Sequence, residues 1–286
     1  ISACLVGSEM CIRDRYLPKN RCRNVVWLLL LLTITSCNLL ESSPYDARVT
    51  GDTGINARNV ARIEKALDGK SSFRFAFISD TQRWYDETEA FVAHLNSRDD
   101  VDFVLHGGDV SDFGVTEEFL WQRDILNELK VPYVVLLGNH DVLGNGVQVY
   151  RRVFGEENFS FMAGDVKFIC LNTNALEFDY SNPIPDFSFI KAQLKDDNPA
   201  YRRTIYAMHV APGDEQFNNN VADVFHLYVK LSPGILCGLY GHGHTFAEAD
   251  KFGDGIIYYE TPCIGKRFYL MFTINAEGYS YEPVYF

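Results

Sequence analysis

The chain has 286 residues, with 26 basic and 38 acidic side chains and a formal net charge of −12 at pH 7. A protein this acidic repels polyanions, because binding along a nucleic acid requires clustered Lys and Arg that neutralise phosphates. The composition therefore argues against a nucleic acid polymer as the partner. The length suits one α/β domain with a large core better than two domains.

The N-terminal segment carries signals that concern export rather than folding. Residues 1–15 show no pattern typical of a fold and resemble translated adapter sequence from a metagenomic assembly, so we exclude them from the fold prediction. Three basic residues between positions 19 and 23 then precede a mostly apolar run at 25–34. This run is too short to span a hydrocarbon core of about 30 Å, so the pattern predicts a secretion signal.

The tetrapeptide Ile34-Thr35-Ser36-Cys37 is similar to a bacterial lipobox, in which the Cys is lipidated and becomes the new N-terminus. The alternative is an ordinary cleaved signal with an incidental Cys. We expect a membrane-anchored lipoprotein of the cell envelope, with a polar tether after Cys37. The expected parts are residues 1–36 as assembly-derived residues and signal peptide, residues 37–70 as tether and N-terminal lead-in, and residues 71–286 as the folded domain.

Strand and helix patterns alternate through the expected domain. The expected strands are residues 73–79, 101–106, 131–137, 159–162, 166–172, 203–209 and 235–240, and the expected helices are residues 86–96, 119–129, 147–154, 187–194 and 221–231. The β-α-β-α-β order at the start favours a parallel sheet with right-handed crossovers. The aromatic tail at 256–285 has strand character, and we expect it to complete a second sheet.

Five of the apolar runs end in residues that can bind a metal or transfer a proton. These blocks are Asp80-Thr81-Gln82, then Gly108-Asp109 with Asp112, then Gly138-Asn139-His140-Asp141, then His209, and finally Gly241-His242-Gly243-His244. Open α/β sheets place their active sites at the carboxyl ends of strands. The five blocks therefore predict one site at one sheet edge.

In this order the blocks resemble those of the calcineurin-like metallophosphoesterases, which are D-x-H, G-D-x-x-D, G-N-H-D/E, a lone His and G-H-x-H. The resemblance covers roughly residues 73–275. It implies an α/β fold in which two sheets form a two-layer sandwich flanked by helices, in the order α/β/β/α, within a single domain. The chain departs from the family pattern at Gln82, where most members carry His.

The resemblance further implies a centre of two divalent metal ions. We expect the carboxylate of Asp109 to bridge the two ions. The other expected ligands are Asp80, Gln82 and His244 for one ion, and Asn139, His209 and His242 for the other. Mixed nitrogen and oxygen ligands of this kind suit Mn, Fe or Zn better than Ca.

The catalytic groups are expected beside these ligands. His140 directly follows a ligand, so we expect its ring to face the leaving group as the general acid. Asp141 is expected to fix the tautomer of that ring. Asp112 follows the bridging residue by three positions, and we expect it to orient either a ligand or His140.

The sequence thus predicts a metal-dependent hydrolase of phosphoester bonds that acts on a small phosphomonoester or phosphodiester. One alternative is a non-catalytic module of the same fold that binds metal or a surface partner, although such a module has no need of the His140-Asp141 pair. Another alternative is a phosphodiesterase for cyclic nucleotides or lipid head groups. The polar loops at 174–186 and 211–220 are expected to select the substrate.

Three cysteines follow Cys37, and two of them lie inside apolar runs. We expect buried free thiols at Cys170, Cys237 and Cys263 rather than a disulfide framework, although an exported location would permit one bridge.

Overall fold

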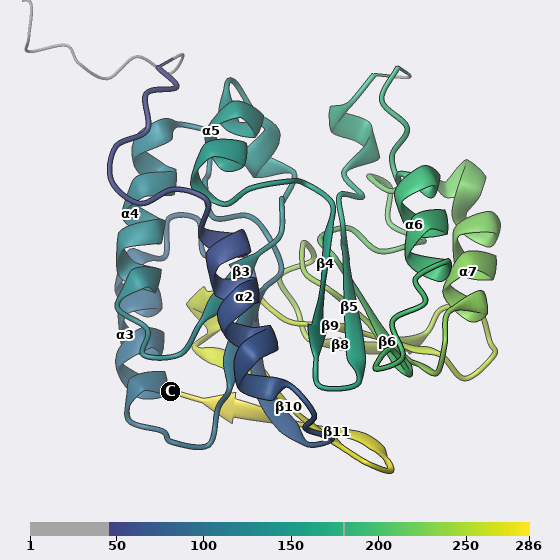
Figure 1. Cartoon of the computed structure of the whole chain (residues 1–286). Helices are drawn as coiled ribbons and strands as arrows, with labels where there is room; N and C mark the ends of the chain where they lie inside the picture. The colour runs from purple at the N-terminus through teal and green to yellow at the C-terminus, as the bar shows by residue number, and fades with distance from the viewer. Residues whose placement is uncertain (1–45, 180) are drawn as a thin grey trace, which may run out of the picture. The chain divides into compact units, whose positions relative to one another are not determined.

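The computed structural model describes residues 46–179 and 181–286, shown in Figure 1 in colours that run from purple to yellow. The expected signal peptide, Cys37 and the first part of the expected tether, residues 38–45, lie outside these residues. Among the helices of the described part, none has the length and apolar character needed to cross a membrane.

The first sheet has five strands in the order β11-β10-β1-β2-β3. Its strands are β1 (Phe73–Ile78), β2 (Phe103–His106), β3 (Tyr133–Val135), β10 (Phe268–Asn275) and β11 (Gly278–Tyr285). Strands β1, β2 and β3 are parallel, as the alternating pattern predicted, while β10 is antiparallel to β1.

The second sheet has six strands in the order β4-β5-β6-β7-β9-β8. Its strands are β4 (Phe159–Ala163), β5 (Val166–Leu171), β6 (Arg203–Met208), β7 (Ile235–Tyr240), β8 (Ala247–Asp250) and β9 (Ile257–Glu260). Strands β5, β6, β7 and β9 are parallel, and β4 and β8 are antiparallel edge strands.

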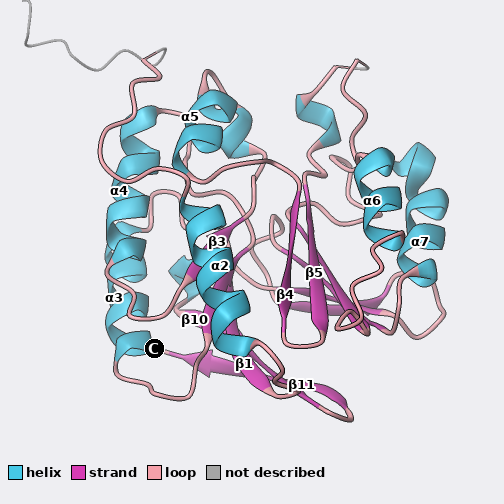
Figure 2. Cartoon of the chain, in the orientation of Figure 1, coloured by secondary structure: helices cyan, strands magenta, loops and turns pink. Residues whose placement is uncertain are grey.

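Helices surround the two sheets (Figure 2). They are α2 (Ile55–Leu67), α3 (Tyr85–Asn96), α4 (Thr116–Asn127), α5 (Gly146–Val153), α6 (Phe187–Leu194) and α7 (Ala222–Leu231), with short 3₁₀ helices η2 (His140–Val142), η3 (Ala175–Glu177), η4 (Asn219–Val221) and η5 (Ile264–Lys266). Helices α3 and α4 lie beside the first sheet, and α6 and α7 lie beside the second.

Aromatic side chains join the two sheets face to face. The ring of Phe75 in β1 stacks on Phe103 in β2 at 5.2 Å and on Phe272 in β10 at 5.1 Å. Its edge meets Phe168 of the second sheet at 5.3 Å. All four side chains are fully buried. Because such ring pairs add roughly 0.5–1.5 kcal/mol each beyond area burial, this layer holds the sandwich together.

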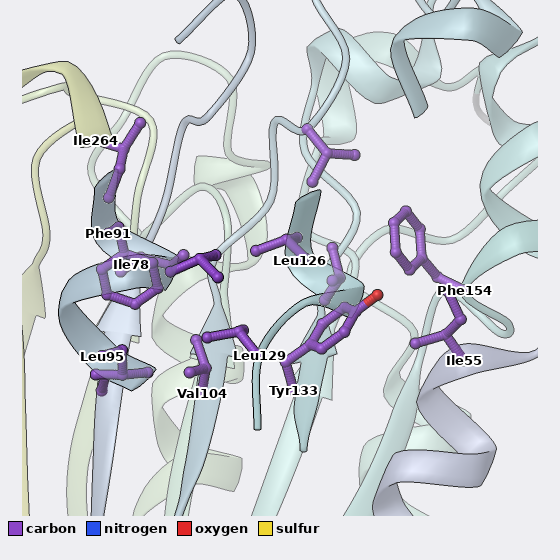
Figure 3. Close-up of a cluster of buried hydrophobic side chains, with 14 of the residues drawn as sticks. Ile55, Ile78, Phe91, Leu95, Val104, Leu126, Leu129, Tyr133, Phe154 and Ile264 are labelled. Carbon is purple, nitrogen blue, oxygen red and sulfur yellow. The ribbon is translucent and has the colours of Figure 1, made fainter. Parts of the chain in front are cut away.

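A buried apolar cluster joins the first sheet to the helices that pack on its outer face (Figure 3). Phe91 and Leu95 of α3 lie one helical turn apart on the buried face of that helix, as their spacing predicts. With Leu126 of α4 they join the same buried cluster as Ile78 and Val104 of the sheet. A third cluster packs α6 and α7 on the second sheet. The layers therefore follow the expected α/β/β/α order.

Helix α2 belongs to the domain, although its residues were assigned to the lead-in before residue 71. Its side chains Ile55 and Ile63 are buried in the core. The Asn56 amide receives a bond from the main-chain N–H of Val135 at 2.9 Å and donates to the carbonyl of that residue at 2.8 Å. These bonds satisfy the free edge of β3, which would otherwise offer unpaired groups to another chain. The domain boundary therefore lies earlier than expected.

The C-terminal tail divides between the sheets. Strand β9 joins the second sheet as expected, but β10 and β11 extend the first, so the prediction for residues 268–285 is wrong. The reason is burial: β10 contributes Phe272 to the core between the sheets and Met271 to the core under α3, as a central strand must. Among the described residues the three cysteines are buried and free, as predicted.

Candidate metal centre

The carboxyl ends of five strands bring the expected ligand residues into one chain of contacts. Strands β1 and β2 end ahead of Asp80 and Asp109, while β6 and β7 end ahead of His209 and His242. Asn139 follows β3 by four residues. These ends belong to both sheets, so the site lies where the two sheets open at one edge.

Four of these residues have unusual backbone conformations. The φ angles are 55° at Asp80, 60° at Asp109, 75° at His242 and 57° at His244. Positive φ is uncommon for residues with a Cβ and persists where surrounding contacts hold the backbone in place. Position 138 requires glycine, because a Cβ there would lie 2.0 Å from Asp109 Oδ1. This backbone conformation brings the polar side chains of the expected ligands close together.

One half of the centre consists of an amide and two imidazoles. Asn139 Oδ1 accepts from His209 Nε2 at 2.9 Å and from His242 Nδ1 at 3.0 Å. His209 is fully buried, and its Nδ1 donates to the carbonyl of Gly107 at 2.8 Å. This second bond fixes the ring so that Nε2 faces the centre, which is the usual arrangement of a metal-binding histidine.

The other half is built on carboxylates. Asp80 Oδ1 lies 3.2 Å from His244 Nε2, and Asp80 Oδ2 accepts from the main-chain N–H of His242 at 3.1 Å. Gln82 donates through Nε2 to Asp109 Oδ2 at 3.3 Å, while its buried Oε1 has no hydrogen-bond partner in the described part of the chain. An acceptor left alone inside a protein costs free energy unless something else binds it.

Asp109 lies between the two halves. Its Oδ2 is 3.3 Å from His209 Nε2 as well as 3.3 Å from Gln82 Nε2. Its Oδ1 accepts from the main-chain N–H of His140 at 2.9 Å. The Asp109 carboxylate thus contacts side chains of both halves, which fits the expected bridging position.

The charges of the centre also fit a cation. Although burial lowers it, the Asp109 carboxylate raises the pKa of His209 to about 10. Although burial opposes it, the contact with His244 lowers the pKa of Asp80 to about 2. The ligand atoms of Asp80, Asp109 and His209 lie within 4.8 Å of one another. Two buried carboxylates thus demand positive charge at this point, and their nitrogen and oxygen neighbours suit divalent transition metals.

His140 lies beside the centre and does not point into it. Its Nδ1 donates to the main-chain carbonyl of Asp112 at 2.8 Å and lies 3.7 Å from Asp112 Oδ1. Its side chain is 36% exposed, so the Nε2 edge remains available to a substrate. Asp112 in turn forms an ion pair with Arg83. The expected link between Asp112 and His140 is therefore present.

The expected contact between Asp141 and the His140 ring is absent, and this prediction is wrong. The buried Asp141 carboxylate accepts four main-chain N–H bonds, all at 2.8–3.0 Å. The donors are Asp109, Val110, Ser111 and Gly138. Asp141 thus holds the loop that carries Asp109, because a carboxylate is the group that several converging amides prefer.

Sequence reasoning missed three residues beside the centre. A cavity of about 130 Å³ lies next to His242 and is lined by Asp214, Lys251 and Glu260 among others. Asp214 Oδ1 lies 3.6 Å from His242 Nε2. Burial lowers the pKa of Lys251 and raises that of Glu260. Asp214 had only its place in the polar loop 211–220 as a signal, and Lys251 had none.

The family follows from a match to a known sequence pattern. The family model of calcineurin-like phosphoesterases matches residues 73–246. This chain belongs to the calcineurin-like phosphoesterase family. The match spans all five blocks, and the resemblance that their order suggested is confirmed.

Similar proteins within and around the family include enzymes and one anchor protein. A 3′,5′-cyclic-nucleotide phosphodiesterase of Nostoc sp. is 26% identical over 207 residues, which cover 66% of this chain and 75% of that protein. A dimetal phosphatase from Danio rerio is 12% identical with a TM-score of 0.54, and the match covers 74% of this chain and 98% of that one.

Two further structures share the fold. A purple acid phosphatase from yellow lupin is 15% identical with a TM-score of 0.54, and the match covers 76% of this chain and 52% of that one. GAP50 of Plasmodium, described as the anchor in the inner membrane complex, is 13% identical with a TM-score of 0.55. The match covers 76% of this chain and 85% of that one. At these identities the structures show the fold alone, which is the calcineurin-like phosphoesterase sandwich.

Proposed function

We propose that this phosphoesterase uses a two-metal centre to hydrolyse a small phosphomonoester or phosphodiester. The observation that carries the proposal is the position of Asp109, whose carboxylate contacts Gln82 on one side and His209 on the other. The remaining ligands would be Asp80 and His244 beside Gln82, and Asn139 and His242 beside His209.

Two bound Mn, Fe or Zn ions would supply Lewis-acid stabilisation of the phosphoryl oxygens and activation of water. The protein's own groups supply position and a proton. His140 Nδ1–H donates to the carbonyl of Asp112, so the ring acts as a general acid in its doubly protonated form, with the second proton on Nε2. That proton passes to the leaving oxygen as the phosphorus–oxygen bond breaks, which is general acid catalysis.

A screen of p-nitrophenyl phosphate and bis(p-nitrophenyl) phosphate with added Mn²⁺ tests the proposal. Chelation should stop turnover, and Asp109→Asn should abolish it and lower the bound metal from about two ions per chain. Asp99→Asn is the matched control, since Asp99 is an exposed carboxylate away from the centre. If Asp109→Asn retains both ions and full turnover, the bridging role is wrong.

The relative from Nostoc adds one substrate class to the screen. Because that protein is named as a 3′,5′-cyclic-nucleotide phosphodiesterase, cyclic nucleotides are a suitable diester to compare with the synthetic ones. A lipid head-group diester is the matched alternative. Higher kcat/KM for diesters than for monoesters would assign the protein to the phosphodiesterases.

A second candidate function is a non-catalytic module that binds metal or a surface partner. The anchor protein of Plasmodium has a related fold, which favours this candidate. The exposed edge of His140 and the free Oε1 of Gln82 favour an enzyme instead. Absence of turnover with every ester and metal in the screen would support the module.

We further propose that Cys37 is lipidated and anchors the protein to a membrane of the cell envelope. The proposal rests on the basic, apolar and small residues that precede Cys37. Cys37→Ser should move the protein from the membrane fraction to the soluble fraction, because acyl chains supply the affinity. Retention of the variant in membranes would contradict the lipid anchor.

A further inference from the structure

A cavity of about 480 Å³ lies between the loop after β5 and the loop after β6. This volume is typical of sites for small organic molecules. Figure 1 shows the first loop rising beyond the end of β5 before the chain returns to α6. Both loops are ones that we expected from the sequence to select the substrate.

The wall of this cavity is largely apolar. The first loop contributes Leu176, Phe178 and Pro183, and the second contributes Phe217 and Val221. Leu176 is 67% exposed and so offers apolar surface to a ligand in the cavity. Aromatic and proline side chains of this kind pack against flat organic groups.

The same wall carries negative charge and amides. Asp179 and Glu215 line the cavity, and none of the described lining residues is Lys, Arg or His. Asn182, Gln216 and Asn218 add amide groups. A second phosphate or a carboxylate on a ligand would be repelled here, because nothing in the wall offsets its charge. The acidic and amide side chains of the wall therefore favour an uncharged group on the ligand.

One segment of chain borders both a small cavity beside the metal centre and this larger cavity. Residues 211–214 border the small cavity at His242, where Asp214 Oδ1 lies 3.6 Å from His242 Nε2. The next residues, 215–218, line the large cavity. Consecutive Cα atoms are about 3.8 Å apart, so the large cavity begins within roughly 10 Å of the His242 ring.

The other loop is tied to the centre as well. The Asn174 amide donates to the carbonyl of Leu137, which directly precedes the Gly138-Asn139 segment, at 2.9 Å. Ala175 and Leu176, the next two residues, line the cavity. The main-chain N–H of Leu176 also donates to the carbonyl of Gln216 at 3.3 Å, which joins the two loops. One wall therefore begins one residue after Asp214, which meets His242, and the other begins one residue after Asn174, which is bonded to the segment that leads to Asn139.

We propose that this cavity is the subsite for the organic group of the phosphoester, and that it takes a flat, uncharged group such as an aryl or heteroaryl ring. The inference rests on the proposed phosphoesterase function and deepens it. The metal centre holds the phosphoryl group, and the cavity selects among esters by the organic group that remains attached to the phosphorus when the leaving group departs.

Two diesters with the same leaving group test the subsite. Methyl p-nitrophenyl phosphate and phenyl p-nitrophenyl phosphate differ only in the second organic group. The wild type should prefer the phenyl ester by about tenfold or more in kcat/KM, as expected for filling an apolar pocket. Leu176→Glu should remove that preference by lowering kcat/KM for the phenyl ester.

The control is Leu227→Glu on α7, because Leu227 is 54% exposed and does not line the cavity. Equal changes for both esters in Leu176→Glu would overturn the subsite and leave the proposed function standing. If the wild type hydrolyses neither ester, both the subsite and the proposed function are wrong. A change of oligomeric state in Leu176→Glu without a change in selectivity would assign the surface to a second copy of the chain.

A charged ester provides an independent arm. The 4-carboxyphenyl analogue of the phenyl ester should react about tenfold more slowly than the phenyl ester in the wild type, because Asp179 and Glu215 repel its carboxylate. Glu215→Lys should restore its rate, and Glu156→Lys, which makes the same change of charge at an exposed site outside the cavity, should not. Equal rates for the two esters in all three proteins would overturn the charge selection.

Discussion

The carboxylate of Asp141 accepts a hydrogen bond from the main-chain N–H of Asp109 at 2.9 Å. The same oxygen accepts from Gly138 at 2.8 Å, while its other oxygen accepts from Val110 and Ser111. One buried side chain thus joins the loop after β3 to the loop after β2. The position of the Asp109 carboxylate, the proposed bridge, depends on a residue that does not face the candidate metal centre.

The first prediction concerns this contact. Asp141→Asn should lower the free energy of unfolding by about 3 kcal/mol, because the amide NH₂ replaces one acceptor oxygen and leaves two main-chain N–H groups without a partner. Urea denaturation measures the loss. Bound metal should also fall, since Asp109 is no longer held in its left-handed conformation.

Asp99→Asn is the control for this change, because it removes an exposed carboxylate. If Asp141 instead served to orient His140, the variant would keep its stability and metal and would lose rate with poor leaving groups only.

The second prediction separates the proton donor from the ligands. His140→Ala should leave metal content nearly unchanged, because the ring faces Asp112 and solvent. Hydrolysis of esters with poor leaving groups should slow by about 10²–10⁴-fold. The loss should shrink with p-nitrophenolate, which departs with little protonation. Equal losses for the two classes of ester would contradict the role of His140 as the general acid.

Much of the fold was predictable because the apolar runs are long and end in recognisable residues. The strands and helices between β1 and β7 lie close to their expected ranges, and the five blocks meet at one edge. The partner of Asp141 was not predictable, since neighbouring residues in sequence suggested a contact with His140. Main-chain N–H donors carry no sequence signal, and the approach of one loop to another depends on tertiary packing.

The same limit explains the strands that were misplaced. The aromatic pattern of β10 shows a strand, yet nothing in it tells which sheet receives the strand. Strand β8 was missed because Ala247–Asp250 is short and polar, as edge strands often are. Helix α2 was missed because its asparagines read as a polar lead-in, although Asn56 and Asn59 are buried against β3.

The third prediction concerns stability and pH. Burial lowers the pKa of His106 to about 3, against 6.5 for an ordinary histidine. Between these two pH values the His106 ring is protonated in the unfolded chain and neutral in the folded chain. The stability that His106 contributes is complete above pH 6.5 and falls as the pH drops toward 3, by up to about 1.4 kcal/mol per pH unit.

His106→Asn tests this pH dependence. An Asn side chain keeps an acceptor for the main-chain N–H of Gly108, which now bonds His106 Nδ1 at 3.1 Å, and cannot take up a proton. Urea unfolding at pH 7 and pH 5 should show a smaller fall in stability for the variant than for the wild type. Parallel pH profiles for the two proteins would contradict the assignment to His106.

The last prediction concerns Gln82, where most family members carry His. Its buried Oε1 has no hydrogen-bond partner among the residues that the structure describes, while its Nε2 donates to Asp109, so the oxygen is positioned to bind a cation. An amide oxygen is a weaker donor than an imidazole nitrogen and favours metals that prefer oxygen. Gln82→His should therefore shift the preference from Mn²⁺ toward Zn²⁺ or Fe and lower the metal concentration for half-maximal activity. Gln193→His, in α6, is the matched control. Metal titrations read by activity and by bound metal distinguish the outcomes: lost activity with unchanged preference would mean that Gln82 contacts a water, and unchanged curves would mean that it does not reach the metal.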